Sequence, residues 1–123
     1  MMAYDMSNIF ARILREELPC KKVAEDEHTL AFEDVNPQAP THILVIPKGH
    51  YIDWTDFARN ASPDEQAAFT RMIGHVAGIA AVDGTGYRVI SNIGGHGHQE
   101  VPHLHMHVLG GAPLGPMLSR ASG

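Results

Sequence analysis

Three histidines, His103, His105 and His107, alternate with apolar residues near the C-terminus of the chain. This period of two predicts a β-strand that places the three imidazoles on one face and the apolar side chains on the other. A glycine pair, Gly110 and Gly111, follows almost directly. A sheet face that carries three imidazoles packs poorly as a core, so the pattern indicates chemistry on an anion or a metal.

Two interpretations of this histidine run remain open from its spacing alone. Imidazoles paired on a strand are common metal ligands, and His42 or Glu100 would be available to complete such a set. In the alternative, one imidazole is a nucleophile and its neighbours handle protons and phosphate charge. The preceding loop favours this alternative, because Asn92 and Gln99 offer amide donors and the glycines between them permit close approach of a ligand. We therefore expect neither a metal nor another cofactor at the site.

The bulk composition predicts one ordinary globular domain. With 123 residues, the chain is long enough to bury a core without disulfides. Cys20 is the only cysteine, which excludes an internal disulfide and fits a reducing cytoplasm. No apolar run approaches the length of a membrane span, and the N-terminus lacks the features of a signal peptide. We expect a cytoplasmic protein with no membrane partner.

The formal net charge of −5 argues against a nucleic-acid partner, because a polyanion would be repelled. Lys21 and Lys22 form the only basic pair. A small phosphorylated ligand is compatible with this charge, since imidazoles and backbone N–H groups can hold it locally. The sequence thus disfavours DNA and RNA as partners but not nucleotides.

Hydrophobic periodicity and turn residues predict two helices and five strands. A helix is expected from Ser7 to about Glu17, and a second from the capping box at Ser62 to about Val82. The expected strands cover residues 23–25, 29–34, 42–47, 87–93 and the histidine run. The apolar run 42–47 predicts a central strand buried on both faces. This order predicts an α+β domain with an antiparallel sheet and helices packed against one side of it.

The histidine run resembles the signature of the histidine triad (HIT) family when it is taken together with four other segments. These segments are Phe32–Asp34, Pro37–His42, Leu44–Pro47 and Asn92. The chain is most similar to the branch of histidine triad nucleotide-binding proteins, the purine nucleoside phosphoramidases, from about Ile9 to Gly111. The resemblance implies a HIT-like α+β fold, in which two helices pack on an antiparallel sheet of about five strands.

The resemblance also implies a division of the chain and an assembly. A HIT domain is expected over residues 7–111, after a disordered N-terminus over residues 1–6. Residues 112–123 are expected to form a C-terminal tail near the active site of a partner subunit. In the implied homodimer the sheet continues across the interface. Gly74 and Gly78 of the second predicted helix would allow close packing, either on a second copy or on the chain's own sheet.

The resemblance assigns the catalytic roles to four histidines. His105 corresponds to the nucleophile, which carries a nucleotidyl group as a covalent intermediate. His103 and His107 correspond to the flanking members that orient the nucleophile and contact the phosphate. His42 corresponds to a fourth histidine that supports the site from a neighbouring strand. A neutral imidazole is a competent nucleophile near pH 7, in agreement with this assignment.

The resemblance assigns nucleotide contacts to a further set of residues. Asp34 matches an acid that binds the ribose hydroxyls, although a lone aspartate at a strand end is commonly a solvated turn residue. Expected at the purine are Ile9, Phe10, Phe32 and Val35, most of which would serve equally as core residues. Expected at the phosphate-binding loop are Asn92, Gln99, Glu100 and Val101. His98 stands where a glycine is expected, and Glu100 where some members have serine, so both bear on leaving-group preference.

The implied activity is hydrolysis of purine nucleoside 5′-phosphoramidates, which are conjugates of AMP or GMP with amines. The reaction would proceed through a nucleotidyl-histidine. A dinucleoside polyphosphate hydrolase or a nucleotidyl transferase of the same family is the enzymatic alternative. A purine nucleotide-binding module without significant turnover is the non-enzymatic one.

Overall fold

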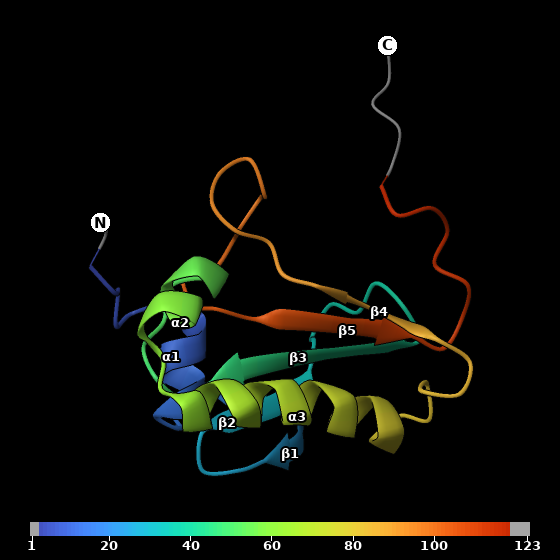
Figure 1. Ribbon diagram of the computed structural model, residues 1–123, viewed down its shortest axis with the longest axis horizontal. Coiled ribbons are helices and arrows are strands. Elements are labelled where there is room, and N and C mark those ends of the chain that lie inside the picture. Colours follow the sequence, from blue (N-terminus) through green and yellow to red (C-terminus); the bar gives the residue numbers. More distant parts are fainter. Residues whose placement is uncertain (1–2, 119–123) are drawn as a thin grey trace.

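The computed structural model describes residues 3–118, which form three helices and five strands (Figure 1). The helices are α1 (Ile9–Leu14), α2 (Trp54–Asn60) and α3 (Pro63–Ile79). The strands are β1 (Lys22–Glu25), β2 (Thr29–Glu33), β3 (Thr41–Pro47), β4 (Tyr87–Ile90) and β5 (Met106–Gly110). All neighbouring strands pair antiparallel in the order β1-β2-β3-β5-β4. This topology confirms the predicted α+β domain with a five-stranded antiparallel sheet.

One face of the sheet packs against α2 and α3. The strands contribute alternate apolar residues to this core, and the helices contribute large side chains from their inner faces. The buried members are Ala31, Ile43, Val45, Phe57, Phe69, Met72, Val76, Leu104, Met106 and Val108. This face therefore holds the larger of the two hydrophobic clusters, and we call it the core face.

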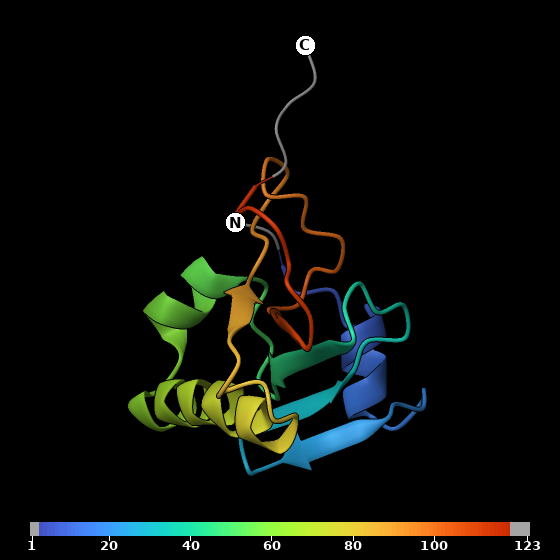
Figure 2. The same ribbon diagram turned by 90° about the vertical axis from the view of Figure 1, so that its right-hand side faces the viewer.

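The opposite face of the sheet packs against α1, and Figure 2 shows α1 in blue on one side of the sheet with α3 on the other. Phe10 of α1 joins a smaller cluster with alternate residues of β2 and β3, namely Leu30, Phe32, Leu44 and Ile46. The expectation that the helices pack against one side is therefore wrong. The reason lies in β3, whose continuous apolar run is buried on both faces and needs a cover on each.

Helix α2 was not expected from the sequence. Asp53 caps it, since the side chain accepts a hydrogen bond from the backbone N–H of Asp56 at 2.8 Å. Phe57 then inserts into the core face, with its ring 5.1 Å from Tyr51 and 5.0 Å from Phe69. A seven-residue helix with one buried anchor carries too little periodicity to stand out in the sequence.

Helix α3 begins at the predicted capping box. The hydroxyl of Ser62 accepts from the N–H of Glu65 at 3.1 Å, and the Glu65 carboxylate accepts from the N–H of Ser62 at 3.0 Å. The helix ends at Ile79, three residues before the expected end, because Ala81 adopts a left-handed conformation with φ of 58°. Within residues 3–118, no helix combines the length and the apolar character needed to cross a bilayer.

The two glycines of α3 do not pack closely on the sheet. Both are exposed, and a Cβ built on Gly74 meets nothing within 4 Å, while one on Gly78 meets only the Asp83 carboxylate at 3.9 Å. Packing on the chain's own sheet was one of the two expected roles of these glycines. The structure contradicts it.

Both terminal segments hold contacts with the domain as far as they are described. Tyr4 donates a hydrogen bond to His103, and the Asp5 backbone carbonyl accepts from the side chain of Asn8 at 2.7 Å. The described residues Tyr4 and Asp5 thus contact the domain, and the expected division of the chain at residues 1–6 stays a prediction. In the C-terminal tail, the Arg88 guanidinium donates to the Gly115 carbonyl at 2.8 Å. The parts of these predictions that concern residues 1–2 and 119–123 lie outside the described residues.

Candidate active site

The histidine run lies only partly on a strand. Strand β5 begins at Met106, so His107 is a strand residue while His103 and His105 precede it. The predicted alternation is nevertheless kept, because the apolar partners of the histidines all point into the core face. The imidazoles point toward α1, where the ring of His105 lies 5.0 Å from Phe10 and 5.1 Å from His107. We call this side of the sheet the histidine face.

Among the described residues, one ring nitrogen of His105 has a hydrogen-bond partner and the other has none. Its Nδ1 lies 2.8 Å from the backbone carbonyl oxygen of His103, and a carbonyl only accepts hydrogen bonds. The proton must therefore lie on Nδ1, which leaves the lone pair of Nε2 unshared. Burial lowers the pKa of His105 below its ordinary value, so the ring is neutral near pH 7. This combination gives a neutral imidazole with a fixed tautomer and a nucleophilic Nε2.

His42 and His107 form a second oriented pair across β3 and β5. The backbone N–H of Gln38 donates to Nδ1 of His42 at 3.0 Å, so the proton of His42 lies on Nε2. That Nε2–H donates to Nδ1 of His107 at 2.9 Å, with an Asp34 carboxylate oxygen 3.3 Å away. His107 in turn carries its proton on Nε2. The amide of Gln38 thus determines the tautomers of both histidines.

The pKa values of this pair keep it neutral. Burial, together with smaller effects of the neighbouring His105 and His42 in the same direction, lowers the pKa of His107 to about 4. Burial also lowers the pKa of His42, against the opposing effect of the Asp34 carboxylate. Both rings are therefore unprotonated hydrogen-bonding groups at pH 7, as is His105.

Among the described residues, Asp34, His42 and His107 form the group that could hold a metal ion. Donor atoms of Asp34, His42 and His107 lie within 4.8 Å of one another. A metal on Nε2 of His42 would move the proton of that ring to Nδ1, where it would meet the N–H donor of Gln38. Two donors would then face each other in a buried position. The donor set therefore disfavours a metal ion and favours the nucleophile interpretation.

His103 lies behind the site and not in it. The residue is 0% exposed, its Nε2–H donates to the Pro47 carbonyl at 2.9 Å, and its Nδ1 accepts from the hydroxyl of Tyr4 at 2.5 Å. Burial lowers the pKa of His103 to about 4. Both ring nitrogens are occupied, so the expected contact of His103 with phosphate is not available in this structure. Its expected role in orienting His105 is consistent with the hydrogen bond to its carbonyl.

A cavity of about 460 Å³ covers the histidine face. It brings together predicted site residues from five parts of the chain. Those that line it are Ile9, Phe10, Phe32, Asp34, Val35, Asn92, Glu100, Val101, His105 and His107. Ile13, Gln38 and Leu44 also line it and were not expected. Ile13 follows Ile9 by four helical positions and Leu44 follows His42 by two strand positions, so periodicity could have identified both.

The rim of this cavity is apolar on one side. Val35 is 93% exposed and Ile9 is 48% exposed, although both are aliphatic. Phe10 and Phe32 lie below them with ring centroids 5.8 Å apart in an edge-to-face arrangement. Exposed aliphatic side chains around a partly open cavity are suited to a flat apolar ligand group. This slot is where the purine-contacting residues were expected.

Gln99 does not line the cavity. Its carbonyl oxygen accepts from the N–H of Gly94 at 3.0 Å, and its amide nitrogen donates to the carbonyls of Ile52 at 2.7 Å and Val101 at 3.0 Å. The side chain therefore holds the 94–101 loop in shape. The expected phosphate contact of Gln99 is not supported by this geometry.

The other side of the rim carries the two departures from the family pattern. His98 adopts a left-handed conformation with φ of 59°, which a glycine adopts without strain. Its Nε2 lies 3.2 Å from a carboxylate oxygen of Glu100, and both side chains are exposed at the cavity. The extra imidazole thus stands at the entrance and leaves the floor of the site open.

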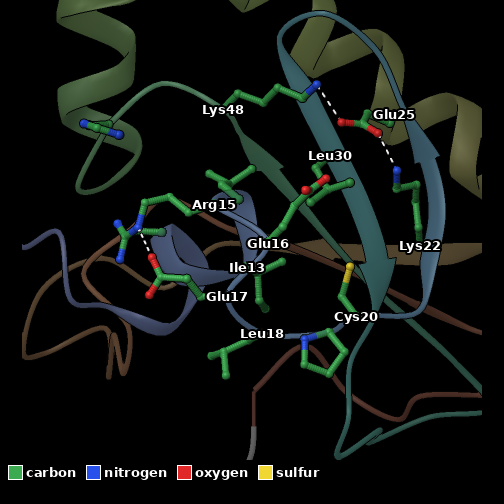
Figure 3. A pocket seen from close by; sticks show the side chains of 14 residues that line it. Ile13, Arg15, Glu16, Glu17, Leu18, Cys20, Lys22, Glu25, Leu30 and Lys48 are labelled. Atoms are coloured by element: carbon green, nitrogen blue, oxygen red, sulfur yellow. Dashed lines mark hydrogen bonds and ion pairs between the residues drawn. The ribbon is translucent and has the colours of Figure 1, made fainter.

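A larger cavity of about 700 Å³ lies between α1, β1 and β2 (Figure 3). Its cations are paired with carboxylates: Lys22 and Lys48 both contact Glu25, at 2.6 and 2.7 Å, and Arg15 contacts Glu17. No histidine of the run lines it. With its charges already neutralised, this cavity is poorly suited to phosphate, and the candidate site remains the smaller cavity above His105.

Comparison with known proteins agrees with this geometry. The model of the HIT domain matches residues 15–114. The chain is 58% identical over 117 residues to an uncharacterized 13.2 kDa HIT-like protein of Azospirillum brasilense, covering 95% of this chain and 96% of that protein. It is 46% identical over 114 residues to the purine nucleoside phosphoramidase of Escherichia coli K12, covering 90% and 92% of the two chains.

Solved structures of related proteins show the same fold. A histidine triad protein from Clostridium difficile superposes with a TM-score of 0.81 at 41% identity, covering 94% of this chain and all of that one. A HIT family hydrolase from Clostridium thermocellum gives a TM-score of 0.83 at 36% identity, over 92% and 97% of the two chains. With the family model, the relatives and the fold in agreement, the chain belongs to the histidine triad (HIT) family.

Proposed function

We propose that this protein hydrolyses the P–N bond of purine nucleoside 5′-phosphoramidates through a nucleotidyl group on His105. The observation that carries the proposal is the hydrogen bond from His105 Nδ1–H to the His103 carbonyl, which leaves Nε2 as the free nitrogen of a residue that lines the cavity. The 46% identity to a purine nucleoside phosphoramidase supports the same reaction.

In the first step, the lone pair of His105 Nε2 attacks phosphorus and the bond from phosphorus to the amine nitrogen breaks. The amine leaves after taking one proton from solvent at the open mouth of the cavity. The imidazole now carries phosphorus on Nε2 and a proton on Nδ1, so it is positively charged. The hydrogen bond from Nδ1–H to the His103 carbonyl strengthens as this charge develops.

In the second step, water attacks the same phosphorus and the bond to Nε2 breaks. Water loses one proton, which balances the proton taken up by the amine, and His105 returns to its neutral tautomer. Throughout both steps His107 donates its Nε2–H toward a phosphoryl oxygen, while His42 holds the ring of His107 from behind. A cycle of two displacements through imidazole replaces one difficult attack by water.

The remaining lining residues would bind the nucleoside. The purine fits the slot between Ile9, Phe10, Phe32 and Val35, which presents aliphatic and aromatic surface. Asp34 would accept the ribose hydroxyls. One of its oxygens accepts from the Asn36 N–H at 2.8 Å and the other lies near His42, but each keeps a further lone pair. Asn92, Glu100 and Val101 line the side of the cavity expected for the phosphate and leaving group.

Trapping of the intermediate tests this proposal. The protein is mixed briefly with a fluorogenic adenosine phosphoramidate, quenched in alkali and analysed by peptide mass spectrometry. An added AMP on the peptide that contains His105 is expected, together with turnover that persists after chelation by EDTA. Activity that disappears with EDTA and returns with zinc would overturn the nucleophile mechanism in favour of a metal enzyme.

The proposed enzyme acts as a homodimer in the cytoplasm. β4 is an edge strand that pairs with β5 alone within residues 3–118, and its Tyr87 and Val89 side chains are exposed. The tail contacts this strand through Arg88, which donates to the Gly115 carbonyl. An apolar edge of this kind would aggregate unless it were covered, and pairing with a second copy would extend the sheet. The exposed glycines of α3 leave room for close packing of that copy.

Light scattering at micromolar concentration tests the assembly. A mass of twice 13.4 kDa is expected, whereas a mass near 13.4 kDa would refute the dimer. Deletion of the residues after Gly111 tests the role of the tail near the partner's active site. A changed selectivity among amine leaving groups is expected; unchanged selectivity would show that the tail plays no part.

A further inference from the structure

The backbone that carries the nucleophile is held by few hydrogen bonds of the sheet. β5 begins at Met106, so residues 101–105 run to the site without strand pairing. Outside the sheet, the Leu104 N–H donates to the Tyr51 carbonyl at 2.8 Å, and the Ser91 hydroxyl donates to the His105 carbonyl at 3.0 Å. The Gln99 amide also donates to the Val101 carbonyl at 3.0 Å, and a further anchor of this segment is the side chain of His103.

His103 is held at both ring nitrogens by parts of the chain far away in sequence. Its Nε2–H donates to the Pro47 carbonyl at 2.9 Å, at the end of β3. Since a carbonyl only accepts, Nδ1 bears no proton and must be the acceptor of the Tyr4 hydroxyl. Burial raises the pKa of that hydroxyl, which keeps its proton available. The direction of both hydrogen bonds of the His103 ring is therefore fixed.

Tyr4 itself is held in place by stacking. Its ring lies parallel to His50, with centroids 4.5 Å apart and an angle of 4° between the planes. The ring also meets His103 edge-on at 5.5 Å. The hydroxyl is thus directed at Nδ1 by a side chain with little freedom. Tyr4 thus contacts His103 from outside the cavity above His105.

We propose that Tyr4 is a positioning residue for the nucleophile: its hydroxyl fixes the ring of His103, and the carbonyl of His103 fixes the tautomer of His105. The inference rests on the proposed function for its catalytic consequence. Tyr4 does not line the cavity above His105, so we expect it to act through His103 and not on the substrate directly. Without the Tyr4 hydroxyl, Nδ1 of His103 has no hydrogen-bond donor in a fully buried position. The His103 ring and the His103 backbone carbonyl are then no longer held in one position.

The test compares Tyr4→Phe with Tyr87→Phe. Phenylalanine at position 4 keeps the stacking on His50 and removes only the hydroxyl. Tyr87 is a matched control, because among the described residues its hydroxyl has no hydrogen-bond partner and its side chain does not line the cavity above His105. Phenylalanine at position 87 also keeps the apolar ring at the edge of the sheet. We expect Tyr4→Phe to lower kcat about tenfold with KM almost unchanged, and Tyr87→Phe to change neither.

Ring-nitrogen NMR of the histidines supplies a readout that needs no substrate. In the unmodified protein His105 is expected as a single tautomer with its proton on Nδ1, and in Tyr4→Phe a second tautomer with the proton on Nε2 should appear. A single tautomer in Tyr4→Phe would overturn the proposal, as would a mixture with unchanged kcat. If the unmodified protein hydrolyses no phosphoramidate, the proposed function fails and the NMR comparison alone decides the role of Tyr4.

Discussion

His107 and Val108 are neighbours on β5, yet their side chains lie in different chemical surroundings. Val108 is fully buried on the core face beneath α3, among aliphatic and aromatic side chains. His107 points to the other side of the sheet, where it receives a hydrogen bond from His42 and lines a cavity. The same contrast separates Ile43 from His42 on β3. Strand alternation thus assigns stability and chemistry to opposite faces of one sheet.

The difference in cover explains why the candidate site lies on the histidine face. α3 has 17 residues and covers the core face together with α2, whereas α1 has six and covers part of the histidine face. Beside α1 the sheet stays open over the cavity of about 460 Å³. A substitution on the core face should therefore change stability and leave chemistry intact, and a substitution of His105, which lines the cavity, should do the reverse.

His105→Ala should have the largest effect on activity. Removal of the nucleophile should lower turnover by a factor of about 10³ or more, because both displacement steps need Nε2. The free energy of unfolding should change little by comparison. Steady-state kinetics with an adenosine phosphoramidate and urea unfolding measure the two effects. His75→Ala, on the exposed side of α3, is the matched control, and near-normal turnover by His105→Ala would exclude the proposed mechanism.

Phe69→Ala tests the core face. The ring is 0% exposed and touches Trp54 and Phe57, so its removal leaves a cavity and should destabilise the domain by about 3–5 kcal/mol. The kcat of the molecules that remain folded should equal that of the unmodified protein. Urea unfolding and active-site titration measure these quantities, with the half-exposed Ile79→Ala as control. A loss of kcat per folded molecule would mean that the two faces are coupled.

The buried histidines should make the free energy of unfolding depend on pH. The pKa values of His103 and His107 are about 4 in the folded protein and near 6.5 in the unfolded chain. Below pH 6.5 the unfolded chain therefore binds protons that the folded protein does not, and stability falls as pH falls toward 4. We expect a loss on the order of 1–2 kcal/mol for each ring between pH 7 and pH 5.

Urea unfolding at several pH values checks this dependence. The stability should be nearly constant above pH 7 and should decline through the acid range. Replacement of His107 by Asn, which does not titrate, should make the decline less steep. A free energy of unfolding that stays constant from pH 7 to pH 5 would contradict the neutral, buried state of these rings.

Asp34→Asn tests ligand binding on the histidine face. Loss of the charged acceptor should weaken AMP binding by about 1.5–3 kcal/mol if the carboxylate takes the ribose hydroxyls. Isothermal titration calorimetry with AMP and with 2′,3′-dideoxy-AMP separates a ribose contact from an effect through His42. Glu33→Gln is the control. It removes the same charge at the exposed neighbouring residue, and this variant should bind AMP normally. Equal affinity of Asp34→Asn and the unmodified protein for AMP would remove Asp34 from the ribose site.

The sequence was most informative where local pattern and tertiary structure coincide. Alternation of the histidines with apolar residues predicted the two faces, and the capping box at Ser62 predicted the start of α3. The predictions that failed concern residues whose role depends on contacts with residues distant in the sequence. The occupied ring of His103 depends on Tyr4, 99 residues away, and the role of Gln99 depends on Ile52, 47 residues away. No local pattern encodes such pairs.

The position of β5 in the sheet has a consequence for folding kinetics. β5 lies between β3 and β4, and the hydrogen bond between His42 and His107 joins residues 65 positions apart. Closing so long a segment is slow compared with forming α3 or the β2–β3 hairpin. The nucleophile, its orienting carbonyl and the His42 pair therefore come together only when β5 inserts. A chain released from the ribosome before residues 103–110 are made lacks His105 and His107 of the candidate site and also Leu104, Met106 and Val108 of the core face.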